Sequence, residues 1–333
     1  MNDSVHRAAR HSLMLPPHVG ETIVTVGTFD GVHRGHLDVL SRLVARSRAT
    51  GRRSVLLTFQ PHPLELLKPD SAPMLLTTPN EKLAAIACAQ IDYVVVLPFT
   101  RALADHSADQ FVDILLRDRL QMSELLIGHD HGFGRGRSGD AETLRALGAR
   151  RGFVVEVVPP VQTEGGHPVS STHIRRALAS GDLDAACEAL GRPYAVSGVV
   201  VPGDARGRTL GFPTLNLVLE SSRKLLPPDG VYAVHADTLL GRFGGMMNLG
   251  GRPTFGEDRR TIEAHLFDAA GDFYGGVVQI RFVSRLRGTR PFDGKEALMA
   301  QLALDEQDAR RALTVFADSA KLKGSMHFPP STP

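Results

Sequence analysis

The sequence predicts two domains, an α/β domain built on a parallel sheet followed by an antiparallel β-barrel. The length of 333 residues favours two domains at about 150 residues each. Apolar strand-like runs first alternate with helical patterns, as in a sheet covered on both faces. Gly, Pro and short strand-like runs dominate later, as in a barrel or sandwich. We expect a lead-in at 1–19, the α/β domain at 20–185, a linker at 186–194, the barrel domain at 195–318 and a flexible tail at 319–333.

The first domain opens with a buried strand at 22–27 (TIVTVG). A helix is expected at 35–50, because Leu37, Leu40 and Leu43 recur at helical spacing and Gly51 can end the helix. The following segments continue this alternation. Further strands are expected at 54–59, 91–97, 124–128 and 153–158, and further helices at 80–90, 108–119 and 140–151.

The second domain follows a helical stretch near 182–190 and the GRPY segment at 191–194. Its short strands are expected at 195–202, 231–237, 244–250, 261–268 and 276–287. Residues 294–318 carry Ala, Leu and Phe at helical spacing, which predicts a closing pair of helices.

Composition excludes several classes of protein. Hydrophobic residues at 42% and charged residues at 22% exclude a mainly disordered chain. The net charge of +2 argues against a nucleic-acid binder, although a small basic pocket for a phosphorylated ligand stays possible. Cys88 and Cys187 are too few for a disulfide framework or a Cys-rich zinc cluster, which fits a reducing cytoplasm. No apolar run approaches the ~20 residues of a membrane span, and residues 1–20 lack the core of a signal peptide.

Two histidines stand where the first strand turns into the first helix, in GTFDGVHRGH at 27–36. Ligands of open α/β sheets bind at the carboxyl ends of strands, and His33 and His36 could donate to phosphate oxygens beside the helix N-terminus. Gly35 between them permits close backbone approach. A helix cap with an exposed neighbour is the alternative interpretation of this pair.

A hydroxyl cluster precedes a helix late in the domain, in VSSTHIRRAL at 169–178. Ser170, Ser171 and Thr172 could hold triphosphate oxygens, and Arg175 on the first turn could grip them bidentately. A plain N-cap is the alternative, and the histidine pair upstream favours phosphate binding.

These segments resemble known families. HRGH resembles the HxGH signature of nucleotidylyltransferases, and with TFQPHP (58–63) and GHDHGFGRGRSGD (128–140) it resembles the FMN adenylyltransferase domain of bacterial FAD synthetases. The resemblance implies a Rossmann-like fold in which His33 and His36 act at the α-phosphorus of ATP. It also implies ATP or phosphate binding by Gly27, Phe29, Asp30, Gly35, Ser170, Ser171, Thr172 and Arg175, with His62, Asp130, Phe133, Arg135 and Arg137 as flavin-site candidates. His131 stands where the family usually has Phe, and Gln60 where an acidic residue is common.

A second constellation opens the barrel domain, in GDARGRTLGFPTLNL at 203–217. Its Gly-rich, Arg-bearing loop could wrap phosphates with backbone N–H groups; the residues concerned are Gly203, Arg206, Gly207, Arg208 and Gly211. Thr214 and Asn216 lie at i and i+2, so both face one side and offer neutral oxygens suited to Mg²⁺ on ATP. Glu263 in TIEAHLFD could be a general base. A structural turn and an exposed strand residue are the alternatives.

The ordered motifs of this domain resemble riboflavin kinase across nearly its whole length, including NLGGRPTFGE at 248–257. The resemblance implies that Thr214 and Asn216 bind Mg²⁺–ATP and that Glu263 activates the riboflavin 5′-hydroxyl. Leu215 and Thr289 depart from the family pattern. The resemblance thus covers about residues 20–310 and points to the bifunctional riboflavin kinase/FMN adenylyltransferases of prokaryotes. It implies riboflavin, FMN, FAD and ATP as ligands. From the net charge and the short apolar runs we expect no nucleic-acid or membrane partner, and we expect a monomer or weak homo-oligomer.

Two other functions are weighed against this one. Another small-molecule nucleotidylyltransferase with an unrelated second module would accept a different phosphate substrate. A non-catalytic flavin or nucleotide sensor would bind the same ligands without turning them over. We expect such a sensor to have lost at least one of the reactive residues, whereas all of them are present here.

Overall fold

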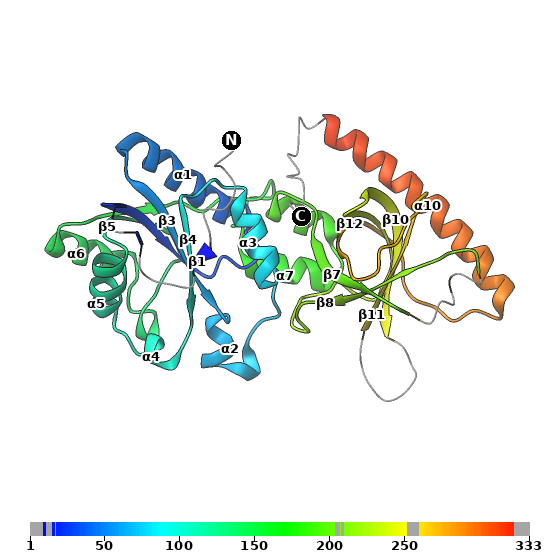
Figure 1. Ribbon diagram of the computed structural model, residues 1–333, viewed down its shortest axis with the longest axis horizontal. Helices are drawn as coiled ribbons and strands as arrows, with labels where there is room; N and C mark the ends of the chain where they lie inside the picture. The colour runs from blue at the N-terminus through cyan, green and yellow to red at the C-terminus, as the bar shows by residue number, and fades with distance from the viewer. Residues whose placement is uncertain are drawn as a thin grey trace. The chain divides into compact units, whose positions relative to one another are not determined.

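The computed structural model describes residues 9–10, 15–16, 18–203, 207, 210–251 and 260–322 (Figure 1). The chain forms two compact units, which we describe separately. The first unit comprises Met1–Leu75 and Pro79–Ser170, and the second comprises Leu76–Thr78 and Ser171–Pro333. The expected tail from residue 323 onward, and most of the expected lead-in, lie outside the described residues.

The first unit is built on a parallel sheet with the strand order β1-β4-β3-β2-β5-β6. Its strands are β1 (Ala9–Arg10), β2 (Thr22–Val26), β3 (Arg53–Gln60), β4 (Tyr93–Pro98), β5 (Met122–Gly128) and β6 (Val154–Val158). From β2 the chain adds β3 and β4 on one side and then β5 and β6 on the other. The order therefore reverses between β2 and β5, and such a switch point opens a crevice for ligands at the carboxyl ends of the strands.

Helices cover both faces of this sheet. They are α1 (Arg34–Thr50), α2 (Pro63–Leu67), η1 (Pro69–Ser71), α3 (Pro79–Ala87), α4 (Arg101–Ala104), α5 (Ala108–Gln110), η2 (Phe111–Arg119, a π-helix), η3 (Arg135–Arg137) and α6 (Ala141–Arg151). Leu40 of α1 and Ile86 of α3 pack with Ile23 on one face. Phe111 of η2 and Leu144 of α6 pack on the opposite face. Adjacent strand residues enter different cores, which confirms the expected α/β architecture.

The second unit contains a closed antiparallel barrel with the order β10-β11-β8-β7-β12-β9. Its strands are β7 (Ala195–Val201), β8 (Leu215–Leu219), β9 (Gly230–Thr238), β10 (Gly241–Gly251), β11 (Arg260–Leu266) and β12 (Val277–Arg287). Helices α7 (Ser171–Ser180) and α8 (Leu183–Leu190) precede the barrel. The expected barrel domain is confirmed, with β8 added at a segment that the sequence had indicated only as extended.

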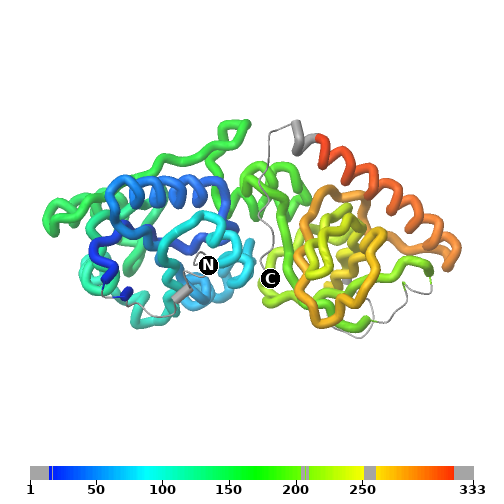
Figure 2. The backbone as a smooth tube through the Cα atoms, turned by 45° about the horizontal axis from the view of Figure 1, so that its top comes forward, coloured from blue at the N-terminus to red at the C-terminus, as the bar shows by residue number. Residues whose placement is uncertain are grey.

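One long helix, α10 (Lys295–Leu322), packs along the outside of the barrel (Figure 2). Ala309 and Leu313 of α10 contact Val231 and Ala233 of β9. The expected pair of closing helices is therefore wrong. Residues 295–322 contain no Gly or Pro to end a helix, and the i,i+4 pair of Arg310 with Glu306 supports continuity.

Candidate active sites

The loop at residues 27–33 connects β2 to α1 at the switch point of the parallel sheet. Phe29 and Val32 are buried and adopt positive φ angles of 49° and 40°. Such left-handed conformations of non-glycine residues cost on the order of 1–3 kcal/mol each and persist only where the surroundings enforce them. A Cβ at Gly27 would lie 2.9 Å from the buried Phe29 ring, so a larger residue there would force that ring to shift. The loop therefore has one enforced shape.

His33 and His36 form a stacked pair at the N-terminus of α1, with ring centroids 3.6 Å apart. Nδ1 of His33 accepts a hydrogen bond from the backbone N–H of His36 at 3.3 Å, so His33 is the N-cap of α1. An accepting Nδ1 carries no proton, which places the proton of the neutral ring on Nε2. The helix N-terminus and the Nε2–H group both favour an anionic ligand. The capping role and a phosphate-binding role are thus compatible.

Asp30 and Gly35 complete this cluster. Asp30 is buried in the same loop, and a Cβ at Gly35 would lie 3.3 Å from the His33 ring. The fold thus brings the expected residues of the 27–36 segment together at one sheet edge.

The segment after β3 places His62 as a helix cap. Nδ1 of His62 accepts from the Leu64 N–H at 3.2 Å, and Glu65 accepts from the His62 N–H at 3.1 Å, which is a complete capping box at α2.

The segment after β5 separates the remaining flavin-site candidates. Asp130 and Arg137 line a cavity of about 410 Å³, and the Arg137 guanidinium donates to the Asp130 carbonyl at 2.7 Å. Phe133 instead packs in the core against Phe111, with ring centroids 4.6 Å apart. Arg135 is exposed on η3. The structure thus brings together two of these four residues around a cavity.

His131 lines the same cavity, and its Nε2 is buried without a hydrogen-bond partner among the described residues. Burial lowers the pKa of His131 to about 4, with the positive charge of Arg137 acting in the same direction and Asp130 opposing both. The ring is therefore neutral at physiological pH and packs edge-on against Phe133.

The hydroxyl cluster straddles the boundary between the compact units. Ser170 is the last residue of the first unit, and Ser171 is the first residue of α7 in the second. Thr172 is exposed, and Arg175 is half-buried one turn later.

Lys82 of α3 is a residue that sequence reasoning missed. Its ammonium group donates to the Phe59 carbonyl at 3.0 Å, the Thr58 hydroxyl at 3.2 Å and the Thr28 carbonyl at 3.3 Å. Thr28 belongs to the 27–33 loop, and Thr58 and Phe59 lie at the end of β3. A single lysine on an expected helix gives no local signal for such a role.

In the barrel, Glu263 lies at the centre of a polar row that crosses three strands. Asn216 of β8 and Asn248 of β10 are its register partners on either side. Leu215 pairs with Ala264 and so belongs to the other face of the ladder. Asn248 is the second residue that sequence reasoning missed, and the segment NLGGRPTFGE is the signal that could have found it.

Two glycines lie directly against the expected magnesium ligands. A Cβ at Gly203 would lie 2.0 Å from Nδ2 and 2.8 Å from Oδ1 of Asn216. A Cβ at Gly207 would lie 2.2 Å from the Phe212 carbonyl and 3.3 Å from Oγ1 of Thr214. The backbone at these two glycines therefore lies directly against both side chains. Gly211 follows with a φ of 83°, whereas Arg206 and Arg208 lie outside the described residues.

This donor set fits a magnesium ion bound to nucleotide phosphates. A hydroxyl and an amide oxygen are hard neutral ligands, and Mg²⁺ usually takes few protein ligands alongside phosphate oxygens and water. Within the described ranges no group of three or more His, Cys, Asp or Glu side chains could hold a metal. His265 supports the arrangement, because its Nδ1 donates to the Pro213 carbonyl at 2.7 Å, one residue before Thr214.

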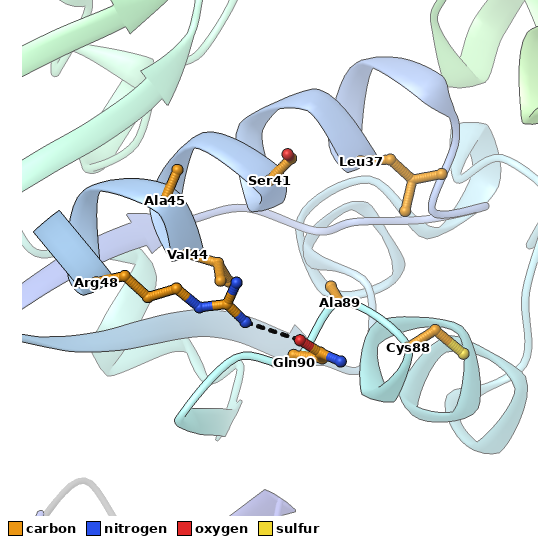
Figure 3. Close-up of a pocket in the computed structure, with 8 residues that line it drawn as sticks. All are labelled: Leu37, Ser41, Val44, Ala45, Arg48, Cys88, Ala89 and Gln90. Carbon is orange, nitrogen blue, oxygen red and sulfur yellow. Dashed lines mark hydrogen bonds between the residues drawn. The ribbon is translucent and has the colours of Figure 1, made fainter.

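A second cavity of about 360 Å³ lies away from these loops (Figure 3). It is lined by Leu37, Ser41, Val44, Ala45, Arg48, Cys88, Ala89 and Gln90. Arg48 donates to the Gln90 side chain at 2.8 Å across it. None of the expected site residues lines this cavity.

Comparisons with known proteins identify each half of the chain separately. The FAD synthetase family model matches residues 16–173, and the riboflavin kinase family model matches residues 190–313. Two bifunctional riboflavin kinase/FMN adenylyltransferases are similar over most of the chain. The Escherichia coli (strain K12) protein is 41% identical, covering 90% of this chain and 95% of that protein. The Bacillus subtilis (strain 168) protein is 35% identical, covering 92% and 97%.

A solved structure described as a macrolide-efflux protein from Streptococcus pneumoniae is also similar. It is 30% identical, with a TM-score of 0.81, and the match covers 91% of this chain and 98% of that one. Over the part of the chain that the structure describes, no helix combines the length and apolar character needed to cross a membrane.

Proposed function

This chain belongs to the family of bifunctional riboflavin kinase/FMN adenylyltransferases, and from this premise we propose how its residues divide the two reactions. The chain is an enzyme that phosphorylates riboflavin to FMN and adenylates FMN to FAD, with ATP as co-substrate in both steps. The observation that carries this conclusion is that each half matches its own family model while the full-length relatives join both activities. An efflux role is not carried over, because neither family model names one.

We assign riboflavin phosphorylation to the barrel unit. Glu263 takes the proton of the riboflavin 5′-hydroxyl, and the oxygen forms a bond to the γ-phosphorus of ATP while the bond to ADP breaks. Thr214 and Asn216 would hold Mg²⁺, which when bound neutralises phosphate charge. The close approach of Gly203 and Gly207 to these two side chains supports this role, since only a bare backbone fits there. Asn248, level with Glu263, orients its carboxylate or the substrate hydroxyl.

We assign FMN adenylylation to residues 20–185. The ionised phosphate of FMN needs no base; its oxygen bonds to the α-phosphorus of ATP, and pyrophosphate leaves. Nε2–H of His33 and the ring of His36 stabilise the charge that develops on the oxygens of the reacting phosphorus. Ser170, Ser171, Thr172 and Arg175 hold the departing pyrophosphate, with Gly27, Phe29, Asp30 and Gly35 shaping the loop that meets ATP.

The flavin contacts of this half are proposed at Asp130 and Arg137, which share a cavity, together with His62, Phe133 and Arg135. His62 as a cap and Phe133 as a core residue would then act by fixing the loops around the ring system.

As functional boundaries we propose 20–185 for adenylylation and 195–318 for phosphorylation, joined by 186–194. The two family models leave residues 174–189 unassigned, and α7 groups with the barrel by its contacts. We further propose a cytoplasmic location, which the small number of cysteines suggests, and a monomer or weak homo-oligomer.

Incubation of the full chain with riboflavin, ATP and Mg²⁺, followed by chromatography, tests the function. FMN should appear first and FAD second. Protein that forms neither product would contradict the proposal. Turnover of pantetheine phosphate or glycerol phosphate in place of FMN would instead identify a different nucleotidylyltransferase, and binding without turnover would identify a sensor.

A further inference from the structure

Lys82 joins three segments that meet at the adenylylation site. The lysine belongs to α3, yet its three donors go to the Thr28 carbonyl after β2 and to the Phe59 carbonyl and Thr58 hydroxyl of β3. The bonded residues are 23 to 54 positions away in sequence. Because all three N–H donors of the ammonium group bind neutral oxygens of the protein, Lys82 cross-links these segments and is not a solvated surface charge.

The loop held by this cross-link is the strained one. Phe29 and Val32 adopt positive φ angles directly after Thr28, and the loop ends at the His33 cap. The Thr28 carbonyl is held twice, by Lys82 and by the Thr58 hydroxyl at 3.2 Å. Strained backbone persists only where neighbouring contacts enforce it, and these two donors act at Thr28, the residue before Phe29.

The charged group that acts on the Lys82 ammonium, the Asp30 carboxylate, also belongs to this loop. Burial lowers the pKa of Lys82 from 10.5 to about 8. The negative charge of the buried Asp30 carboxylate acts in the opposite direction but is the smaller effect. Facing the ammonium from β3 are a hydroxyl and a carbonyl, neither of which titrates. The group is therefore mainly protonated at neutral pH and lies close enough to its pKa for pH to switch it.

We propose that Lys82 is a positioning residue for FMN adenylylation, which fixes the 27–33 loop and thereby the orientation of His33 and His36. This inference rests on the proposed role of the two histidines. Without the cross-link the loop relaxes and the reacting groups shift, and misplacement on the order of 1 Å costs about 10²-fold in rate.

The test compares Lys82→Met with a matched control, Lys68→Met, at an exposed lysine of the same unit. Lys82→Met should lower kcat for FMN adenylation about 10²-fold, with a smaller effect on KM for ATP. Riboflavin phosphorylation, measured in the same samples, should stay at the wild-type rate, and Lys68→Met should match wild type in both assays. Adenylation by folded Lys82→Met at the wild-type rate would overturn the proposal.

A pH profile separates positioning from a purely structural role. Wild-type kcat for adenylation should fall as pH rises through about 8, and folded Lys82→Met should lack this limb. Between the folded pKa of about 8 and the ordinary value of 10.5, the unfolded chain binds more protons than the folded one. The contribution of this group to stability therefore rises with pH, so unfolding through Lys82 cannot explain lost activity in that range. A flat wild-type profile would overturn the inference.

Thr58→Val decides the case if Lys82→Met fails to fold. It removes the second donor to the Thr28 carbonyl and should lower adenylation several-fold without affecting phosphorylation. Wild-type adenylation by Thr58→Val together with a flat pH profile overturns the proposal. Full adenylation activity in His36→Ala as well would contradict the proposed adenylylation site itself. Full activity in the Lys82 and Thr58 variants together with lost activity in His36→Ala would contradict only the positioning role of Lys82.

Discussion

At the scale of single residues, Gly203 shows how one missing side chain shapes the kinase site. The Asn216 amide occupies the space that a Cβ would need, at 2.0 Å. We expect Gly203→Ala to displace Asn216 and to lower riboflavin phosphorylation about 10²-fold, while adenylation of supplied FMN is unchanged. Steady-state kinetics of both reactions measure this. Gly288→Ala is the control, because a Cβ there would meet only the Arg285 side chain, at 3.7 Å. Equal kinase rates in both variants would exclude the proposed role of Asn216.

His131 is a residue whose protonation opposes folding. Its folded pKa of about 4 lies below the ordinary value of 6.5, so the unfolded chain takes up a proton first as pH falls. Stability linked to His131 is therefore present above about pH 6.5 and lost as pH falls toward 4. His131→Phe should lose this dependence and gain on the order of 1 kcal/mol at neutral pH, because it removes an unpartnered buried nitrogen.

Urea unfolding at several pH values measures this effect of His131→Phe. His129→Gln, which removes an exposed neighbouring histidine, is the control. The same pH dependence in His131→Phe as in wild type would show that another group is responsible.

The residues that could be found from sequence are those whose chemistry is local. His33 with His36, and Thr214 with Asn216, are separated by a few positions, so a helix turn or strand period already relates them. Lys82 meets its partners only because β2, β3 and α3 converge, and no spacing along the chain encodes that. The flavin-site role of Phe133 stays a prediction, and its burial against Phe111 depends on how η2 packs, which no local spacing encodes.

At the scale of elements, the pattern of apolar runs predicted most of the strands and helices around the two sites to within a few residues. The main error was at α10, where helical spacing indicates a helix but does not show whether it breaks. The structure shows one continuous helix from Lys295 to Leu322. The short β8 was missed as a strand. It pairs with the preceding strand β7 across the Gly-rich loop and with β11, which lies far away in sequence.

Asp92 ties the starts of β3 and β4 together. Its carboxylate accepts from the Ser54 N–H at 3.0 Å, the Ser54 hydroxyl at 2.7 Å and the Arg53 guanidinium at 3.1 Å. Burial raises the pKa of Asp92, but these hydrogen bonds outweigh burial and lower it below its ordinary value. The contribution to stability is therefore present above the unfolded value of 3.8 and is lost as pH falls through the lower folded value.

Asp92→Asn should cost about 1–3 kcal/mol of unfolding free energy at neutral pH. The difference from wild type should shrink in acid, where the native carboxyl takes up its proton. Denaturant unfolding at neutral and acid pH gives both values, and Asp70→Asn, at an exposed position, is the control. A difference that does not change with pH would show that the charge of Asp92 is unimportant.

At the scale of the whole molecule, the proposed segments 20–185 and 195–318 each carry one reaction, and the product of the second segment is the substrate of the first. Sequence reasoning predicted two domains from length and from the change of pattern. It could not predict that Leu76–Thr78 and α7 would group with the barrel, because such grouping is set by tertiary contacts.

The central claim, two separate catalytic sites in one chain, is tested most directly by assaying His36→Ala and Glu263→Gln for both reactions. His36→Ala should lower FAD formation from FMN about 10²–10³-fold and leave FMN formation unchanged. Glu263→Gln should lower FMN formation about 10²–10⁴-fold and leave adenylation of supplied FMN unchanged. Loss of both activities in either variant, with the protein still folded, would contradict the account.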